Sequence, residues 1–285
     1  MQRSTKHQEW YAAAQQYEAA GDLYHAFKLY KQLIKHAPEW PDPYLALAKL
    51  YHERQEWKPS FYYFKKAVSF FPDRREAWWS LGIAATALKK WSVARSVWSK
   101  FGITKMGKAP EGLRLAYNGI FEILWMQALD PARGQILSIP HPDSGYRFRD
   151  ILLYERKPIG HHIVNQKRVV VYKEMGLFKR SPFDTHSCLL HDVNAEQIDR
   201  LEKLCYDGRL GFEVWSNAAQ GMVVNNPGAF PEYYGRSILG EEKNEAVSNH
   251  ALIAIAAIHQ AEVIHVLDAW QVITSGRYSD LRRYR

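Results

Sequence analysis

A period of 34 residues runs from His7 to about Lys108 and constrains this chain more than any other feature of its sequence. Large aromatic residues and small residues recur at fixed offsets in each period, and a proline follows in the first two. The aligned columns are Trp10, Tyr44 and Trp78; Ala14, Ala48 and Gly82; Ala26, Ser60 and Ala94; Tyr30, Phe64 and Trp98; and Pro38 and Pro72. This regularity predicts one structural unit repeated along the chain.

Each unit is predicted to be a pair of helices, for example residues 41–54 and 58–71, because apolar residues recur three and four positions apart. Neither helix could bury its apolar face alone, so neighbouring helices must stack. The small residues Ala14, Ala48 and Gly82 form one column and let the two helices of a unit approach closely. Pro38 and Pro72 end the second helices because proline lacks the amide hydrogen that a helix interior needs.

This pattern over residues 7–108 resembles the tetratricopeptide repeat. The resemblance implies a superhelix of three helix pairs whose concave wall binds another protein. The wall-facing positions would be held by Tyr11, Gln15, Glu18, Leu45, Lys49, His52, Trp79, Ile83 and Thr86. Chaperone binding is not predicted, because Tyr11 and Gln15 stand where the subfamily that clamps a chaperone's terminal carboxylate has Lys and Asn. In an alternative interpretation, Tyr11 and Trp79 pack against the following domain.

Residues 109–130 are predicted to form a capping or connecting helix. The stretch from Pro110 to Leu129 is strongly apolar, and Arg114, Asn118 and Glu122 form one polar stripe at a spacing of four. Such a helix would cover the open end of the superhelix. Asp130 and Pro131 would end it.

The predicted fold is therefore an α-helical tetratricopeptide-repeat superhelix with a capping helix, followed by a smaller α+β domain of no recognised family at residues 131–285. Short strands separated by turns are expected at residues 135–139, 146–154, 160–164, 168–172, 185–190 and 211–215. A helix is expected from its cap at Asn194 to its stop at Gly208. The order of repeats followed by such a domain resembles bacterial repeat proteins. This resemblance contains no motif that would assign a function to a particular residue.

The remaining segments of this domain are less regular. Residues 217–242 are rich in Gly, Asn, Pro and Tyr, and a loop of this length suggests binding or wrapping of a neighbour. Residues 245–270 are expected to be helical or mixed, with residues 251–257 open between a buried strand and a helix. Residues 277–285 are expected to be an exposed basic and aromatic tail.

Charge is distributed unevenly between the two parts. Residues 1–109 hold 18 Lys and Arg against 9 Asp and Glu, which is +9 in a chain of net charge +8. A basic repeat surface would attract an acidic protein or a nucleic acid, and salt would weaken that attraction. Alternatively, the lysines of residues 1–109 form solvated helix faces that keep the protein soluble.

The strongest candidates for chemistry are Asp184, His186, Cys188 and His191, because the first three alternate onto one face of a strand. The spacing allows a metal site or a cysteine nucleophile and requires neither. Other histidine and acid pairs are typical of turns and helix surfaces; they are His141 with Asp143 and Asp150, His161 and His162, and His259 and His265 with Glu262 and Asp268. Motifs for phosphate loops, zinc proteases and serine hydrolases are missing from the sequence.

Three functions follow, in order of preference. The first is binding of another protein by the repeats, as an adaptor, an assembly factor or a toxin-neutralising immunity protein, with no cofactor. The second is an enzyme or metal site in the α+β domain, and the third is nucleic-acid binding. A cytoplasmic location is expected, because the longest apolar run spans only residues 251–258 and the two cysteines define no disulfide framework.

Overall fold

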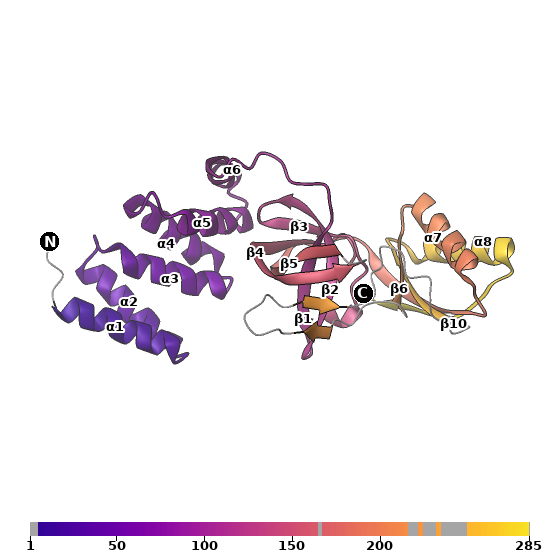
Figure 1. The fold of residues 1–285 in the computed structure, drawn as a ribbon, viewed down its shortest axis with the longest axis horizontal. Coiled ribbons are helices and arrows are strands. Elements are labelled where there is room, and N and C mark those ends of the chain that lie inside the picture. Colours follow the sequence, from indigo (N-terminus) through magenta and orange to yellow (C-terminus); the bar gives the residue numbers. More distant parts are fainter. Residues whose placement is uncertain (1–4, 165–166, 216–221, 225–231, 235–249, 285) are drawn as a thin grey trace. The chain divides into compact units, whose positions relative to one another are not determined.

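The computed structural model describes residues 5–164, 167–215, 222–224, 232–234 and 250–284 (Figure 1). The chain divides into two compact units, Met1–Lys105 and Met106–Arg285. The second unit is larger than the first, so the prediction that the α+β domain is the smaller part of the chain is wrong. The expected loop at residues 217–242 falls mostly outside the described residues.

The first unit consists of helices packed in consecutive pairs, as the period predicts (Figure 1). Their bounds are α1 Thr5–Ala19, α2 Leu23–His36, α3 Pro41–Glu53, α4 Trp57–Phe70, α5 Arg75–Ala87 and α6 Trp91–Lys100. Asp22 begins α2 by accepting the backbone N–H of His25 at 3.2 Å. Pro41 lies in the first turn of α3, where its missing N–H costs no hydrogen bond.

The aligned columns build the core of the first unit. Ala14, Ala26 and Tyr30 are buried in one cluster. The column of small residues is needed for close packing, because a Cβ added to Gly82 would lie only 2.5 Å from Cη2 of Trp98. The small residue on α5 and the ring on α6 therefore occupy adjoining space, as the alignment of the repeats predicts.

The predicted helix at residues 109–130 is wrong, because this stretch forms a β-hairpin. Strands β1 (Glu111–Tyr117) and β2 (Ile120–Asp130) pair antiparallel, with Leu113 opposite Leu124. Asn118 and Gly119 form the turn with φ angles of 49° and 76°, which suit a two-residue hairpin connection. In the predicted helix, the same Asn118 belongs to the polar stripe. Its position before glycine was the stronger signal.

The larger sheet of the second unit closes on itself. Its order is β3-β2-β1-β5-β4-β9-β8, and β3 (Arg133–Ile136) also pairs with β4 (Ile151–Val164). The other strands are β5 (Lys167–Lys179), β8 (Met222–Val224) and β9 (Glu232–Tyr234). β1 and β5 pair in parallel, and apolar side chains of the ring fill one core around Leu115, Met126 and Tyr154. The predicted strands at residues 160–164 and 168–172 pair with each other, but the first of them belongs to a longer strand that begins at Ile151 and includes part of another predicted strand.

The smaller sheet has the order β11-β6-β10-β7. The predicted strand, helix and strand appear as β6 (Asp184–His191), α7 (Ala195–Asp207) and β7 (Gly211–Val214). The ambiguous residues 251–257 belong to strand β10 (His250–Ala257), followed by α8 (Gln260–Thr274), and both helices lie on one face of this sheet (Figure 1). The predicted exposed tail is wrong, because β11 (Arg277–Tyr284) pairs with β6 and places Tyr278 and Leu281 against the core.

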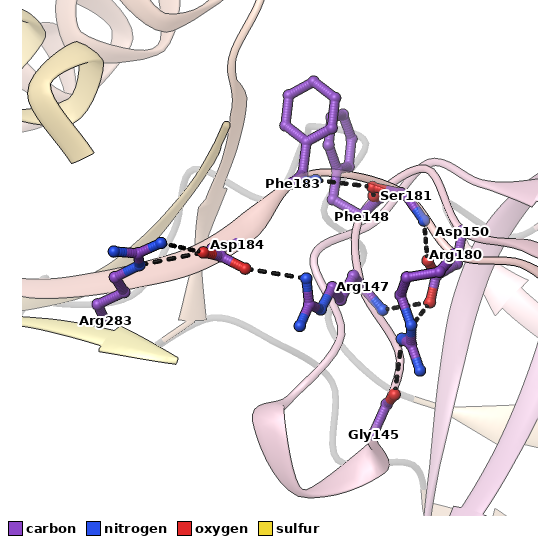
Figure 2. A network of polar contacts seen from close by, with 9 residues as sticks. All are labelled: Gly145, Arg147, Phe148, Asp150, Arg180, Ser181, Phe183, Asp184 and Arg283. Carbon is purple, nitrogen blue, oxygen red and sulfur yellow. Dashed lines mark hydrogen bonds and ion pairs between the residues drawn. The ribbon is translucent and has the colours of Figure 1, made fainter. Parts of the chain in front are cut away.

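A polar network fastens the loop that contains the 3₁₀ helix η1 (Pro142–Ser144) to both sheets (Figure 2). Asp150 is fully buried, pairs with Arg180 at 2.7 Å and accepts the backbone N–H of Ser181 at 2.7 Å. Arg147 pairs with Asp184 on β6 at 2.9 Å, and Arg283 of β11 pairs with the same carboxylate at 2.6 Å. Each of these two carboxylates is therefore paired with at least one guanidinium group, which offsets part of its loss of hydration.

Candidate functional site

A groove in the first unit collects residues from three helices and from the start of a fourth. Its cavity has a volume of about 180 Å³. Helices α1, α2 and α3 and the residue before α5 supply its lining, which consists of Tyr11, Gln15, Glu18, Tyr30, Asp42, Leu45, Ala46, Lys49 and Arg74. The structure thus brings together five of the nine residues expected on the concave wall, namely Tyr11, Gln15, Glu18, Leu45 and Lys49.

Aromatic rings form one side of the groove. The ring of Tyr11 lies 5.7 Å from that of Tyr30 and 4.9 Å from that of Trp40, measured between centroids. Tyr30 is 1% exposed and donates its hydroxyl hydrogen to Oε2 of Glu18 at 2.7 Å. Burial, together with the Glu18 carboxylate, raises the pKa of Tyr30. This hydroxyl therefore stays protonated and holds Glu18 at the edge of the groove.

Both signs of charge line the groove. Trp40 donates its indole N–H to Oδ2 of Asp42 at 2.6 Å, so this carboxylate is held by the aromatic side. Lys49 is exposed, and the Arg74 guanidinium lies 4.9 Å from the centroid of the Phe71 ring. Within the described ranges, neither Lys49 nor Arg74 forms an ion pair. Two cationic groups are therefore available to a ligand at this surface.

The other four residues expected on the wall lie outside this groove. His52 is 7% exposed and its ring contacts those of Trp57 and Phe64. Trp79 packs its ring against Trp98 and Phe101.

The last two residues of this set lie on α5. Ile83 and Thr86 have no exposed surface, and Thr86 donates its hydroxyl hydrogen to the Gly82 carbonyl at 2.8 Å. The lining of the groove thus draws on α1 and α3 from the predicted set, and not on α5.

Sequence reasoning missed four lining residues, which are Tyr30, Asp42, Ala46 and Arg74. The helical period offered a signal for two of them, because Asp42 and Ala46 share one face of α3 with Leu45 and Lys49. The aligned columns predict Tyr30 only as a core residue, and nothing in the sequence places Arg74 beside α1 and α2.

The four residues of β6 that were predicted as metal ligands or as a nucleophile either interact with other side chains or are buried. Asp184 is paired with two arginines, and His191 lies 2.8 Å from Oγ of Ser279. His186 is 1% exposed, and burial lowers its pKa. Burial raises the pKa of the Cys188 thiol to about 12, so this thiol is protonated at neutral pH. Across the part of the chain that the structure describes, no group of three His, Cys, Asp or Glu side chains is arranged to hold a metal ion.

Two carboxylates, of the buried Glu213 and the half-buried Glu122, interact where the sheets of the second unit meet. Glu213 is 3% exposed and accepts the backbone N–H of Ile139 at 3.1 Å. Glu122 accepts the hydroxyl of Tyr117 at 3.3 Å and the backbone N–H of His141 at 3.4 Å. Burial raises the pKa of Glu122 to about 7 and that of Glu213 well above its usual range. These two groups were not among the sequence candidates.

Comparison with known proteins agrees with the repeat pattern. The tetratricopeptide repeat family model matches residues 7–50, which span α1, α2 and most of α3. The comparison thus identifies a tetratricopeptide repeat in residues 7–50, and the helix pairs that follow continue the same period. In the described residues, none of the helices has the length and apolarity that crossing a membrane requires.

Two solved structures show weaker similarity. One is the first tetratricopeptide repeat domain of Spaghetti (RPAP3) bound to an HSP90 peptide, SRMEEVD; it is 19% identical, and the match covers 34% of this chain and 78% of that one with a TM-score of 0.31. The other is a hypothetical protein from Neisseria gonorrhoeae; it is 12% identical, and the match covers 61% of this chain and 94% of that one with a TM-score of 0.26.

Proposed function

We propose that the first unit binds a segment of another protein in the groove between α1, α2 and α3. Tetratricopeptide repeats generally mediate protein binding, and residues 7–50 match that family. The observation that carries the proposal is the lining itself, which combines rigid rings, a leucine and two cations that form no ion pair among the described residues. Buried aromatic anchors beside a few polar groups are typical of protein-binding surfaces.

The lining also favours a particular chemistry in the partner. An apolar side chain would pack between Tyr11 and Leu45, and an acidic group would pair with Lys49 or Arg74. The positive charge of residues 1–109 would speed the approach of an acidic partner. Adaptor, assembly factor and immunity protein are all roles that stoichiometric binding of this kind would serve. Cys188 and Cys205 are free and buried, which suits the cytoplasm.

Site-directed photo-crosslinking tests where the partner binds. A photoreactive phenylalanine analogue is placed at Gln15, which is exposed in the groove, and in a matched variant at Lys28, which is exposed on α2 outside the lining. We expect one protein to be crosslinked from Gln15 and not from Lys28. Equal crosslinking of the same proteins from both positions would contradict a groove-specific partner.

Charge reversal then measures the contribution of the cations. With the purified partner, Lys49→Glu is expected to weaken binding by about tenfold or more, because it replaces attraction by repulsion at the groove. Lys28→Glu and Lys65→Glu change the net charge equally outside the lining and serve as controls. If all three variants lose affinity to the same extent, the attraction is a property of net charge and the groove is not the binding site.

A further inference from the structure

A second cavity lies in the larger unit, where the loop after η1 meets the turn between α7 and β7. It has a volume of about 410 Å³ and is lined by Arg149, Tyr206, Asp207, Arg209 and Leu210. The cavity is open to solvent, since Leu210 is buried and the other four lining residues are exposed. None of the residues singled out from the sequence lies in this lining.

The two sides of this cavity are fixed by packing within the protein. A Cβ added to Gly211, at the start of β7, would lie 3.1 Å from Cδ1 of Phe148, so the loop and the strand are in close contact. Phe148 also packs edge-on against Phe183, with ring centroids 5.3 Å apart (Figure 2). Arg149 follows Phe148, and Arg209 lies two residues before Gly211. The cavity is therefore formed before any ligand arrives.

Both arginines of the lining are free to pair with an anion. The Arg149 guanidinium lies 5.2 Å from the ring centroid of Phe148 and 5.3 Å from that of Phe183. Stacking of this kind uses the face of the guanidinium group and leaves its in-plane N–H donors available. Over the described ranges, neither Arg149 nor Arg209 forms an ion pair.

Both arginines have a left-handed backbone conformation. Arg149 has φ 62° and Arg209 has φ 58°, in the left-handed region that side chains with a Cβ disfavour. A glycine stands next to Arg209, but Gly208 ends α7 with φ −77°, so the position that favours glycine holds an arginine instead. The end of α7 accounts for the conformation of Arg209, whose backbone N–H donates to the Tyr206 carbonyl at 2.9 Å, and Gln55 and Lys89 have the same conformation after α3 and α5.

We propose that this cavity binds a phosphate monoester of a small molecule. Two guanidinium groups match the oxygens of a phosphate in geometry and charge. Asp207 reduces the formal charge of the lining to +1, which suits a single phosphate better than a polyanion, and it can accept a hydrogen bond from a hydroxyl group of the ester. Tyr206 is 81% exposed and offers a ring face at the edge of the cavity.

The test measures the affinity of the full-length protein for three probes by calorimetry, namely adenosine 5′-monophosphate, inorganic phosphate and adenosine. Adenosine 5′-monophosphate is expected to bind and adenosine is not. Binding of inorganic phosphate alone would overturn the assignment of an ester as the ligand. Lack of binding by both phosphate compounds would overturn the site.

Glycine variants separate loss of the site from loss of folding. Arg209→Gly and Arg149→Gly are each expected to weaken binding by about tenfold or more, since each removes one charged donor. Arg209→Gly should not lower the melting temperature, because glycine adopts the left-handed conformation without strain, whereas Arg149→Gly also loses the stacking on Phe148 and Phe183. Arg200→Gln, on the exposed side of α7 outside the lining, is the matched control and should bind normally. Unchanged affinity in both glycine variants would contradict the proposal.

Discussion

At the scale of single residues, the repeat columns predicted which side chains would meet. The alignment placed Gly82 among small residues and Trp98 among rings, and the structure brings these two into contact. Such pairs could be read from the sequence because each repeat buries the same faces. Glu122 and Glu213 could not be found in this way, since their proximity depends on the meeting of two sheets that are distant in sequence.

Gly82→Ala is expected to destabilise the first unit by about 1–3 kcal/mol, because the added methyl group would overlap Trp98. Denaturant unfolding followed by tryptophan fluorescence measures this. Ser96→Ala, at an exposed position of α6, is the control and should have little effect. An unchanged midpoint for the Gly82 variant would mean that α5 and α6 are packed less closely than described.

Glu122→Gln should make the protein more stable above pH 7 and leave it unchanged below about pH 4.5. The pKa of Glu122 is raised to about 7 in the folded state, so the folded protein retains a proton that the unfolded chain releases, and stability falls as pH rises between these values. Glutamine resembles the protonated form and avoids this loss, which is on the order of 3 kcal/mol.

Thermal unfolding of the wild type and the Glu122 variant between pH 4 and pH 8 measures the difference. The lowered pKa of His186 has the opposite effect on stability but is present in both proteins, so it cancels in the comparison. Parallel curves for the two proteins would show that Glu122 is not protonated in the folded state at neutral pH.

At the scale of elements, helical periodicity was reliable in the repeats and in α7, whose ends are marked by Asn194 and Gly208, and it failed at residues 109–130. Three polar residues at a spacing of four suggested a helix, yet Arg114, Asn118 and Glu122 belong to a hairpin. A strand is recognised by alternation of apolar and polar residues, and this stretch contains too few polar residues to show that alternation. The turn at Asn118 and Gly119 was therefore the only local signal for a hairpin. Similarly, the charges of β11 concealed a strand whose other residues contact the core.

Gly119→Ala is expected to destabilise the second unit by about 1–2 kcal/mol. Gly119 has φ 76° and open space around its Cα, so the cost arises from backbone conformation and not from a clash. Gly107→Ala is the matched control, because Gly107 also has open space but no left-handed backbone. Equal effects of the two substitutions on the unfolding midpoint would contradict the assigned turn.

At the scale of the whole molecule, the sequence distinguished a helical part ending at residue 108 from a mixed part beginning at residue 131, and it assigned residues 109–130 to a connecting helix that belongs to neither. The structure divides the chain after Lys105. The cluster around Ala14, Tyr30 and Leu47 gives the first unit a core of its own. The closed sheet could not be predicted, since its parallel pairing of β1 with β5 joins segments far apart in sequence.

A fragment of residues 1–105 is therefore expected to fold by itself, with helical circular dichroism and one cooperative thermal transition. Gly82→Ala should lower the stability of this fragment by the same amount as in the full chain. A fragment that lacks cooperative unfolding would show that the repeats depend on residues 106–285 for their stability.

The pairing of β6 with β10 on one side and β11 on the other has a consequence for the timing of biosynthesis. A nascent chain carries β6 outside the ribosome long before either neighbouring strand has been translated. During that interval both edges of β6 are open to mispairing with other chains. We therefore expect truncation before Arg277 to yield insoluble product, whereas the repeats, whose neighbours follow one another directly, can assemble as they emerge.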